Sequence, residues 1–111
     1  MEVYIIAQLS FTYRDAYDAY QRGFFDVFRQ YRGELLAADE QAEVLEGEWH
    51  GDKVVLMSFP DEAAAREFID SPAYREISVL RRAGAKTTAL LVRGLARMRR
   101  GAPGRESASD A

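Results

Sequence analysis

The chain of 111 residues contains no cysteine and only one histidine. Without cysteine there is no disulfide, no catalytic thiolate and no thiolate-bound zinc or iron–sulfur cluster. A single histidine also excludes a metal site that one chain builds from several histidines. We therefore expect a protein that uses neither a metal nor a cofactor.

Positive charge and long apolar runs are also scarce. The formal net charge is −3, which argues against a dedicated nucleic-acid-binding protein. No apolar run approaches the roughly 20 residues that a membrane span needs. The N-terminus lacks the basic segment and cleavage site of a signal peptide. These absences predict a cytoplasmic protein that binds neither nucleic acid nor a membrane.

Enough apolar material is present for one folded domain. Hydrophobic residues make up 48% and charged residues 30% of the chain, which is ordinary for a globular protein. Residues 1–94 are predicted to form a single domain. Residues 95–111 combine arginine with glycine, proline and serine, so they are predicted to be a basic and mostly flexible tail.

Hydrophobic periodicity predicts the order β-α-β-β-α-β. A stripe of aromatic residues at helical spacing marks the first helix, and Asp61 and Ser71 are predicted caps for a second helical region in two pieces. Gly51 is predicted to lie in a hairpin turn. The predicted strands are residues 3–11, an interrupted strand over 35–49, and residues 54–59 and 87–92; the first helix covers residues 13–32.

This order predicts an α+β, ferredoxin-like fold. Right-handed crossovers place both helical regions on one face of a four-stranded antiparallel sheet with the strand order 4-1-3-2. The other face would then be bare, although Tyr4, Ile6, Val54 and Leu56 make it apolar. A bare apolar face is typical of an interface, so we expect a homodimer that packs sheet against sheet.

Three tyrosines and one arginine are candidate ligand-binding residues. Tyr17 and Tyr20 lie on the apolar side of the first helix, and Tyr74 shares a face of the last helix with Arg81. Phenols that line a cavity bind aromatic molecules, but an aromatic stripe is also typical of an ordinary core. Arg81 could clamp a carboxylate, or it could offset the dipole at the C-terminus of its helix.

Glu46 and Trp49 form a second candidate pair, ahead of the predicted hairpin turn. Trp49 could form the wall of a pocket in which Glu46 acts as a base or hydrogen-bond acceptor. Alternatively, Trp49 packs in the core and Glu46 lies on a sheet edge. His50 follows them and is expected to be exposed in the turn.

Three stretches of sequence resemble a known family: residues 42–49 (AEVLEGEW), 59–64 (FPDEAA) and 71–74 (SPAY). Over about residues 4–95 the chain is similar to the "domain of unknown function 1330" family. The resemblance implies a fold of the dimeric α/β-barrel superfamily and a homodimer, and it implies no particular activity. Relatives in that superfamily include cofactor-free monooxygenases and lactone isomerases that work in a cavity between helices and sheet.

Two functional hypotheses follow. In the first, a homodimeric barrel binds or transforms a small, partly apolar, anionic or phenolic molecule without a metal. In the second, the same dimer is a non-catalytic interaction or regulatory module. A cavity lined by Tyr17, Tyr74 and Arg81 favours the first, whereas a space filled by these side chains favours the second. A nucleic-acid-associated protein that uses the basic tail is the weakest alternative.

Overall fold

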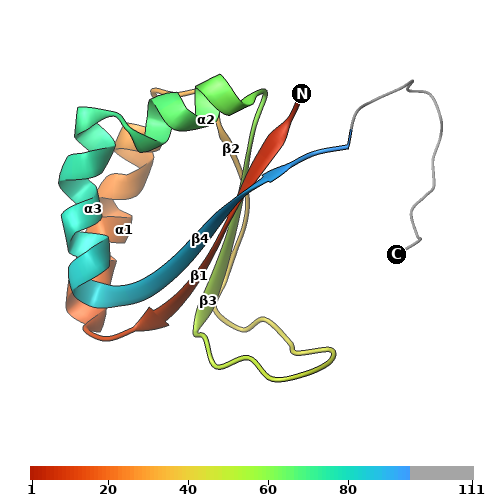
Figure 1. Cartoon of the computed structure of the whole chain (residues 1–111). Helices are drawn as coiled ribbons and strands as arrows, with labels where there is room; N and C mark the ends of the chain where they lie inside the picture. Colours follow the sequence, from red (N-terminus) through yellow and green to blue (C-terminus); the bar gives the residue numbers. More distant parts are fainter. Residues whose placement is uncertain (96–111) are drawn as a thin grey trace.

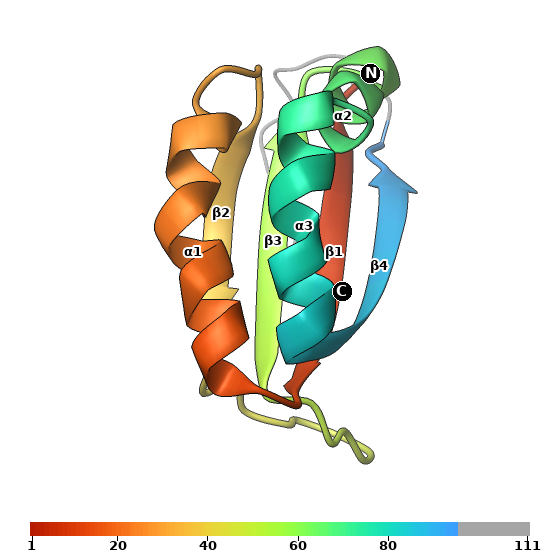
Figure 2. The ribbon, with the colours of Figure 1, turned by 90° about the vertical axis from the view of Figure 1, so that its left-hand side faces the viewer.

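Two strands with apolar residues on both faces, β1 (Val3–Phe11) and β3 (Lys53–Phe59), form the centre of the sheet in the computed structural model, which describes residues 1–95. β2 (Glu34–Asp39) pairs with β3, and β4 (Ala85–Arg93) pairs with β1. All pairs are antiparallel, and the order is β2-β3-β1-β4 (Figure 2). Read from the opposite edge, this is the predicted order 4-1-3-2, so the ferredoxin-like prediction is confirmed.

The helices cover only one face of this sheet (Figure 1). α1 (Arg14–Phe28) and α3 (Pro72–Gly84) lie side by side over the strands, and α2 (Glu62–Ile69) lies across one end. The predicted caps are present. The Asp61 carboxylate accepts a hydrogen bond from the Ala64 N–H at 2.8 Å, and the Ser71 hydroxyl accepts one from the Tyr74 N–H at 3.1 Å.

The aromatic stripe of α1 faces the sheet as predicted, with Tyr17, Tyr20, Phe24 and Phe28 buried. The helix nevertheless ends four residues earlier than the sequence suggests. Beyond Phe28 the chain tightens, because the N–H groups of residues 30 and 31 bond to carbonyls only three residues back.

The hairpin turn and the second half of the interrupted strand are not formed. Residues 40–52 are an irregular loop instead, which extends away from the helices (Figure 1). The pairing of β2 with β3 runs from Glu34 opposite Ser58 to Asp39 opposite Val54. The last residue of β2 therefore lies opposite the start of β3, so β3 has no residues left to pair with residues 43–49. The positive φ needed for the chain reversal occurs at Gly47 (φ +86°) and not at Gly51.

Strand register decides which side chains meet the helices. Leu9 lies opposite Lys53 in β3 and opposite Thr87 in β4. Directly opposed residues share a face of the sheet, so Lys53, Leu9 and Thr87 form one row beneath the helices. Tyr4 and Ile6 alternate with this set and lie on the open face.

The described residues end at Leu95. The predicted basic tail, residues 95–111, therefore lies outside them except for its first residue. Within residues 1–95, no helix combines the length and the apolar composition required to cross a bilayer.

Candidate functional site

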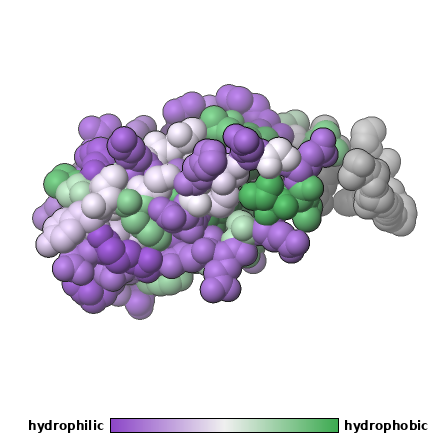
Figure 3. All heavy atoms as spheres, turned by 90° about the horizontal axis from the view of Figure 1, so that it is seen from below, coloured by the Kyte–Doolittle hydropathy of each residue, from purple (hydrophilic) through white to green (hydrophobic). Residues whose placement is uncertain are grey.

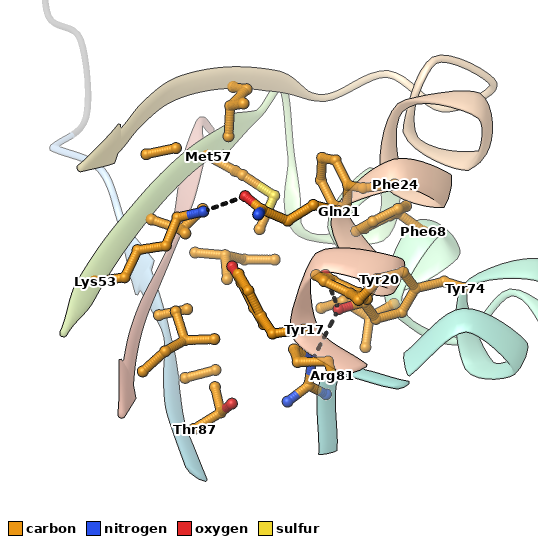
Figure 4. Close-up of a pocket in the computed structure, with 18 of the residues that line it drawn as sticks. Tyr17, Tyr20, Gln21, Phe24, Lys53, Met57, Phe68, Tyr74, Arg81 and Thr87 are labelled. Atoms are coloured by element: carbon orange, nitrogen blue, oxygen red, sulfur yellow. Dashed lines mark hydrogen bonds between the residues drawn. The ribbon is translucent and has the colours of Figure 1, made fainter. Parts of the chain in front are cut away.

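A cavity of about 240 Å³ lies between α1, α3 and the sheet (Figure 4). Most of its wall is apolar and comes from the helix-facing side chains of β1 and β3 together with the aromatic stripe of α1. Among the lining residues are Ile5, Leu9, Phe24, Val55, Met57 and Phe68. A few polar groups interrupt this wall, which is the usual composition of a small-molecule site.

The first polar cluster of the cavity consists of three side chains linked by hydrogen bonds. The Tyr20 and Tyr74 hydroxyls lie 2.8 Å apart, and Arg81 donates a hydrogen bond from Nε to the Tyr74 oxygen at 3.3 Å. Burial raises the pKa of Tyr20 well above its ordinary value of 10, and the neighbouring Tyr74 adds to the shift. The Tyr20 phenol therefore stays protonated, and one side of the cavity presents neutral hydroxyls beside a guanidinium.

Tyr17 is almost fully buried between these three side chains and the sheet. Burial raises the pKa of Tyr17 to about 12, and the negative charge of Glu40 adds to the effect. At neutral pH its hydroxyl is a proton donor and carries no charge. In Figure 4 the hydroxyl points toward the side of the cavity where Lys53 and Gln21 meet.

Lys53 forms the second polar group. Its side chain is only 5% exposed, and Nζ donates a hydrogen bond to Gln21 Oε1 at 2.7 Å. Nζ also lies 4.9 Å from the centre of the Tyr17 ring and 3.8 Å from Glu40 Oε2. Burial lowers the pKa of the Lys53 amine, an effect that the carboxylate of Glu40 only partly offsets.

A salt bridge connects α1 to the start of the loop next to this amine. Arg14 donates two hydrogen bonds to the Glu40 carboxylate, at 3.0 and 2.9 Å, and a third to Asp18 at 2.8 Å. This bidentate geometry holds the Glu40 carboxylate in one orientation. The charge of Glu40 is therefore shared between Arg14 and Lys53.

Thr87 is the third polar group, on the floor of the cavity. Its Oγ1 is buried and has no hydrogen-bond partner among the described residues, although the residue lines the cavity. A buried hydroxyl without a partner is costly, and a water or ligand in the cavity would satisfy it.

The structure brings four of the six sequence-predicted site residues together and leaves two apart. Tyr17, Tyr20, Tyr74 and Arg81 line the cavity. Glu46 is exposed in the loop. Trp49 lies at the end of the loop, where its Nε1 donates a hydrogen bond to Gln8 Oε1 on the open face of the sheet at 3.3 Å.

Sequence reasoning missed Lys53, Gln21 and Thr87. Lys53 lies one residue before the predicted strand of residues 54–59, but it has the same period-2 parity as Val55, Met57 and Phe59, which face the helices. Among residues 1–95, no three carboxylate or histidine side chains come close enough to hold a metal ion.

The sheet order, the helices on one face and the cavity between them define the class as a ferredoxin-like α+β protein. The chain belongs to the family described as "Domain of unknown function (DUF1330)", whose model matches residues 2–95. The resemblance noted from the three sequence stretches is thereby confirmed. Among curated proteins, none is detectably similar in sequence.

Solved structures show the same fold. A protein of unknown function from Rhodopseudomonas palustris, RPA0582, superposes with a TM-score of 0.71 at 24% identity, covering 86% of this chain and 84% of its own. A dimeric ferredoxin-like protein of unknown function from Thermobifida fusca superposes with a TM-score of 0.59 at 16% identity, covering 82% and 89%. SnoaB from Streptomyces nogalater, described as a cofactor-independent oxygenase, gives a TM-score of 0.64 at 13% identity, covering 87% and 96%.

Proposed function

We propose that this protein is a homodimer that binds a small, partly apolar molecule with an anionic or phenolic group, in the cavity beneath α1 and α3. The observation that carries the proposal is the composition of the cavity: an apolar wall with the Tyr20–Tyr74–Arg81 chain on one side. Its volume lies just below the range of about 300–1,000 Å³ that drug-sized ligands occupy. A molecule of about one or two fused rings matches this space.

Arg81 is the group that would select the anion. It is partly buried, and the Tyr74 hydroxyl is a neutral partner that leaves the positive charge uncompensated. A partly buried cation is stabilised by a carboxylate or phenolate beside it. The apolar wall would then hold the rings of the same molecule by stacking and burial.

The test is calorimetric titration with 6-hydroxy-2-naphthoate, which carries two fused rings, a phenol and a carboxylate. We expect saturable binding that Arg81→Met weakens by about tenfold or more, as loss of a charge-assisted hydrogen bond predicts. Arg82→Met is the matched control, because Arg82 is the next residue on the same helix and is exposed. No binding, or equal effects of the two variants, would favour the non-catalytic interaction module.

The open face of the sheet supports the dimer. Leu90 and Val92 of β4 are 53% and 40% exposed, and Ile6 and Leu56 lie beside them on the central strands. Apolar area of this kind is unusual on a monomer. Seen from the end of the molecule that carries the loop of residues 40–52, further apolar surface lies on the side away from the helices (Figure 3). The exposed side chains of Val44 and Leu45 belong to that loop. The Thermobifida fusca neighbour, which is described as dimeric, is consistent with a second copy as the occupant.

Sedimentation equilibrium tests this assembly. We expect twice the chain mass of 12.6 kDa at micromolar concentration, and we expect Leu90→Glu to yield monomers because it buries a charge in the interface. Val79→Glu is the control, since Val79 is similarly exposed but lies on α3, away from the open face. A wild-type monomer would refute the dimer and leave the cavity proposal standing.

A further inference from the structure

The amine of Lys53 lies in surroundings that compensate an ammonium ion only in part. Its side chain is almost completely buried, it lines the cavity, and its closest hydrogen-bond partner is the neutral Gln21 amide. A lysine in an apolar site is the usual activated amine of carbonyl chemistry, since only the neutral form carries the nucleophilic lone pair.

We propose that Lys53 is a nucleophile that forms an imine with an aldehyde or ketone bound in the cavity. The proposal rests on the function proposed above, because it uses the same cavity and the same ligand. It adds a carbonyl group to the ligand, placed at Lys53, while the anionic or phenolic group lies toward Arg81. In Figure 4, Tyr17 lies between these two polar ends.

The charges around Lys53 only partly offset the effect of its burial. From α1, Arg14 and Asp18 face it with opposite charges, and from the start of the loop Glu40 lies 3.8 Å from Nζ. The carboxylate of Glu40 is already bound by two hydrogen bonds from Arg14, and that of Asp18 by one. Neither acid is therefore free to balance an ammonium ion fully. The net result is that burial lowers the pKa of Lys53.

Tyr17 is positioned to donate the proton that imine formation requires. With a pKa of about 12 its phenol is protonated at neutral pH. Its ring lies directly beside the Lys53 amine, 4.9 Å from Nζ to the ring centre, and its hydroxyl points toward the same side of the cavity. A proton donor at this position assists departure of the oxygen of the adduct.

The step balances without an oxidant or reductant. The Lys53 nitrogen attacks the carbonyl carbon, a C–N bond forms, and the π electron pair moves to oxygen, which takes up a proton to give a carbinolamine. The C–O bond then breaks and the oxygen leaves as water. The nitrogen loses two protons in forming the C=N bond, and the departing oxygen gains two. Tyr17 or solvent transfers these protons. The products are one imine and one water.

The chain offers a clean test because it has only two lysines, Lys53 and Lys86. Lys86 lies on the open face and does not line the cavity, so it is the control. The probe is 6-hydroxy-2-naphthaldehyde, with cyanoborohydride to reduce any imine to a stable secondary amine. Intact mass and peptide mapping then locate the adduct. We expect one adduct per chain at neutral pH, formed at Lys53 at least tenfold faster than at Lys86.

Two variants and one competitor complete the experiment. Lys53→Met should abolish the fast adduct, whereas Lys86→Met should leave it unchanged. 6-Hydroxy-2-naphthoate, which lacks a reactive carbonyl, should slow labelling of Lys53 and not that of Lys86. The rate at Lys53 should also level off at a lower pH than the rate at Lys86. Peptide mapping of the labelled wild-type protein distinguishes Lys53 from Lys86 even if Lys53→Met does not fold.

The outcomes separate the two proposals. If the naphthoate binds but Lys53 is labelled no faster than Lys86, the imine proposal is wrong and Lys53 is an ammonium that anchors an anion; the proposed function then stands. If neither compound binds in the cavity, both proposals fail. Labelling confined to Lys86 and the N-terminal amine would likewise overturn the imine proposal.

Discussion

The hydroxyl groups of Tyr20 on α1 and Tyr74 on α3 lie 2.8 Å apart and form a polar link between the two helices. The rings also meet edge to face, with centres 6.3 Å apart. The buried Tyr20 hydroxyl depends on Tyr74 for its hydrogen bond, whereas the Tyr74 oxygen also accepts one from Arg81. The link thus belongs both to the core and to the wall of the cavity.

The losses of unfolding free energy from replacing each tyrosine alone should add up to more than the loss from replacing both together. Tyr20→Phe leaves the Tyr74 oxygen with Arg81 as its partner, and Tyr74→Phe leaves the Tyr20 hydroxyl buried without one. We expect each variant to lose about 1 kcal/mol of unfolding free energy, with the larger loss for Tyr74→Phe. Urea denaturation of both single variants and the double variant measures the coupling, for which we expect about 0.5–1.5 kcal/mol. Strict additivity would contradict the hydrogen bond.

The same pair predicts instability at alkaline pH. The pKa of Tyr20 is raised by burial, so the folded state keeps this proton at a pH where the unfolded phenol, with a pKa of 10, has lost it. The stabilisation is complete below pH 10 and is lost as the pH rises toward the folded pKa. Denaturation between pH 8 and 11 should show this decline. It should be smaller for Tyr20→Phe, whereas an equal decline in both proteins would contradict the assignment.

Two glycines should respond oppositely to alanine. A Cβ at Gly23 would lie 3.7 Å from Ile77 Cγ2, an ordinary contact, so Gly23→Ala should stabilise α1 by about 0.5–1 kcal/mol. A Cβ at Gly84 would overlap the backbone nitrogen of Tyr17 and lie 2.7 Å from the Tyr13 carbonyl oxygen. Gly84→Ala should therefore lower the melting temperature by several degrees or more. Thermal melts of the two variants, which are each other's controls, check both directions.

Lys53→Met should not destabilise the protein at neutral pH. The folded pKa of Lys53 is lowered from its ordinary value of 10.5, so below that folded pKa the protein bears the cost of a buried ammonium. Methionine has a similar shape and removes this cost. We expect a gain of up to about 1 kcal/mol, or about 4–8 °C, that shrinks as the pH approaches 10.5. Lys86→Met is the control and should change little. A large loss with Lys53→Met would show that the amine is well compensated.

The fold could be predicted because its signals are periodic and local. The alternation in β1, the aromatic spacing in α1 and the caps at Asp61 and Ser71 each act within a few residues. The loop of residues 40–52 was misread because its apolar residues imitate a strand, although β3 is too short to pair with them. Whether residues 43–49 find a partner strand depends on register, which is a tertiary property.

The site was predictable only in part. Tyr17, Tyr20, Tyr74 and Arg81 were found because helical spacing assigns a face to each of them. Lys53 was missed because a charged residue at a strand end resembles a turn residue. Its burial depends on α1 lying above it, where Gln21 supplies the acceptor. The alternation in β3 gives the face on which Lys53 lies, but it does not show that Gln21 lies above it.

The wall of the cavity and the hydrophobic core are largely the same residues. Ile5, Leu9, Tyr17, Phe24 and Met57 belong to both. A substitution that widens the cavity for a bulkier molecule therefore also removes packing, at a cost of about 2–5 kcal/mol for a large-to-small change. A small domain has about 5–15 kcal/mol of stability in total. New ligand preferences in this scaffold are thus limited by folding, and one or two such changes exhaust what the domain can tolerate unless a stabilising substitution such as Gly23→Ala accompanies them.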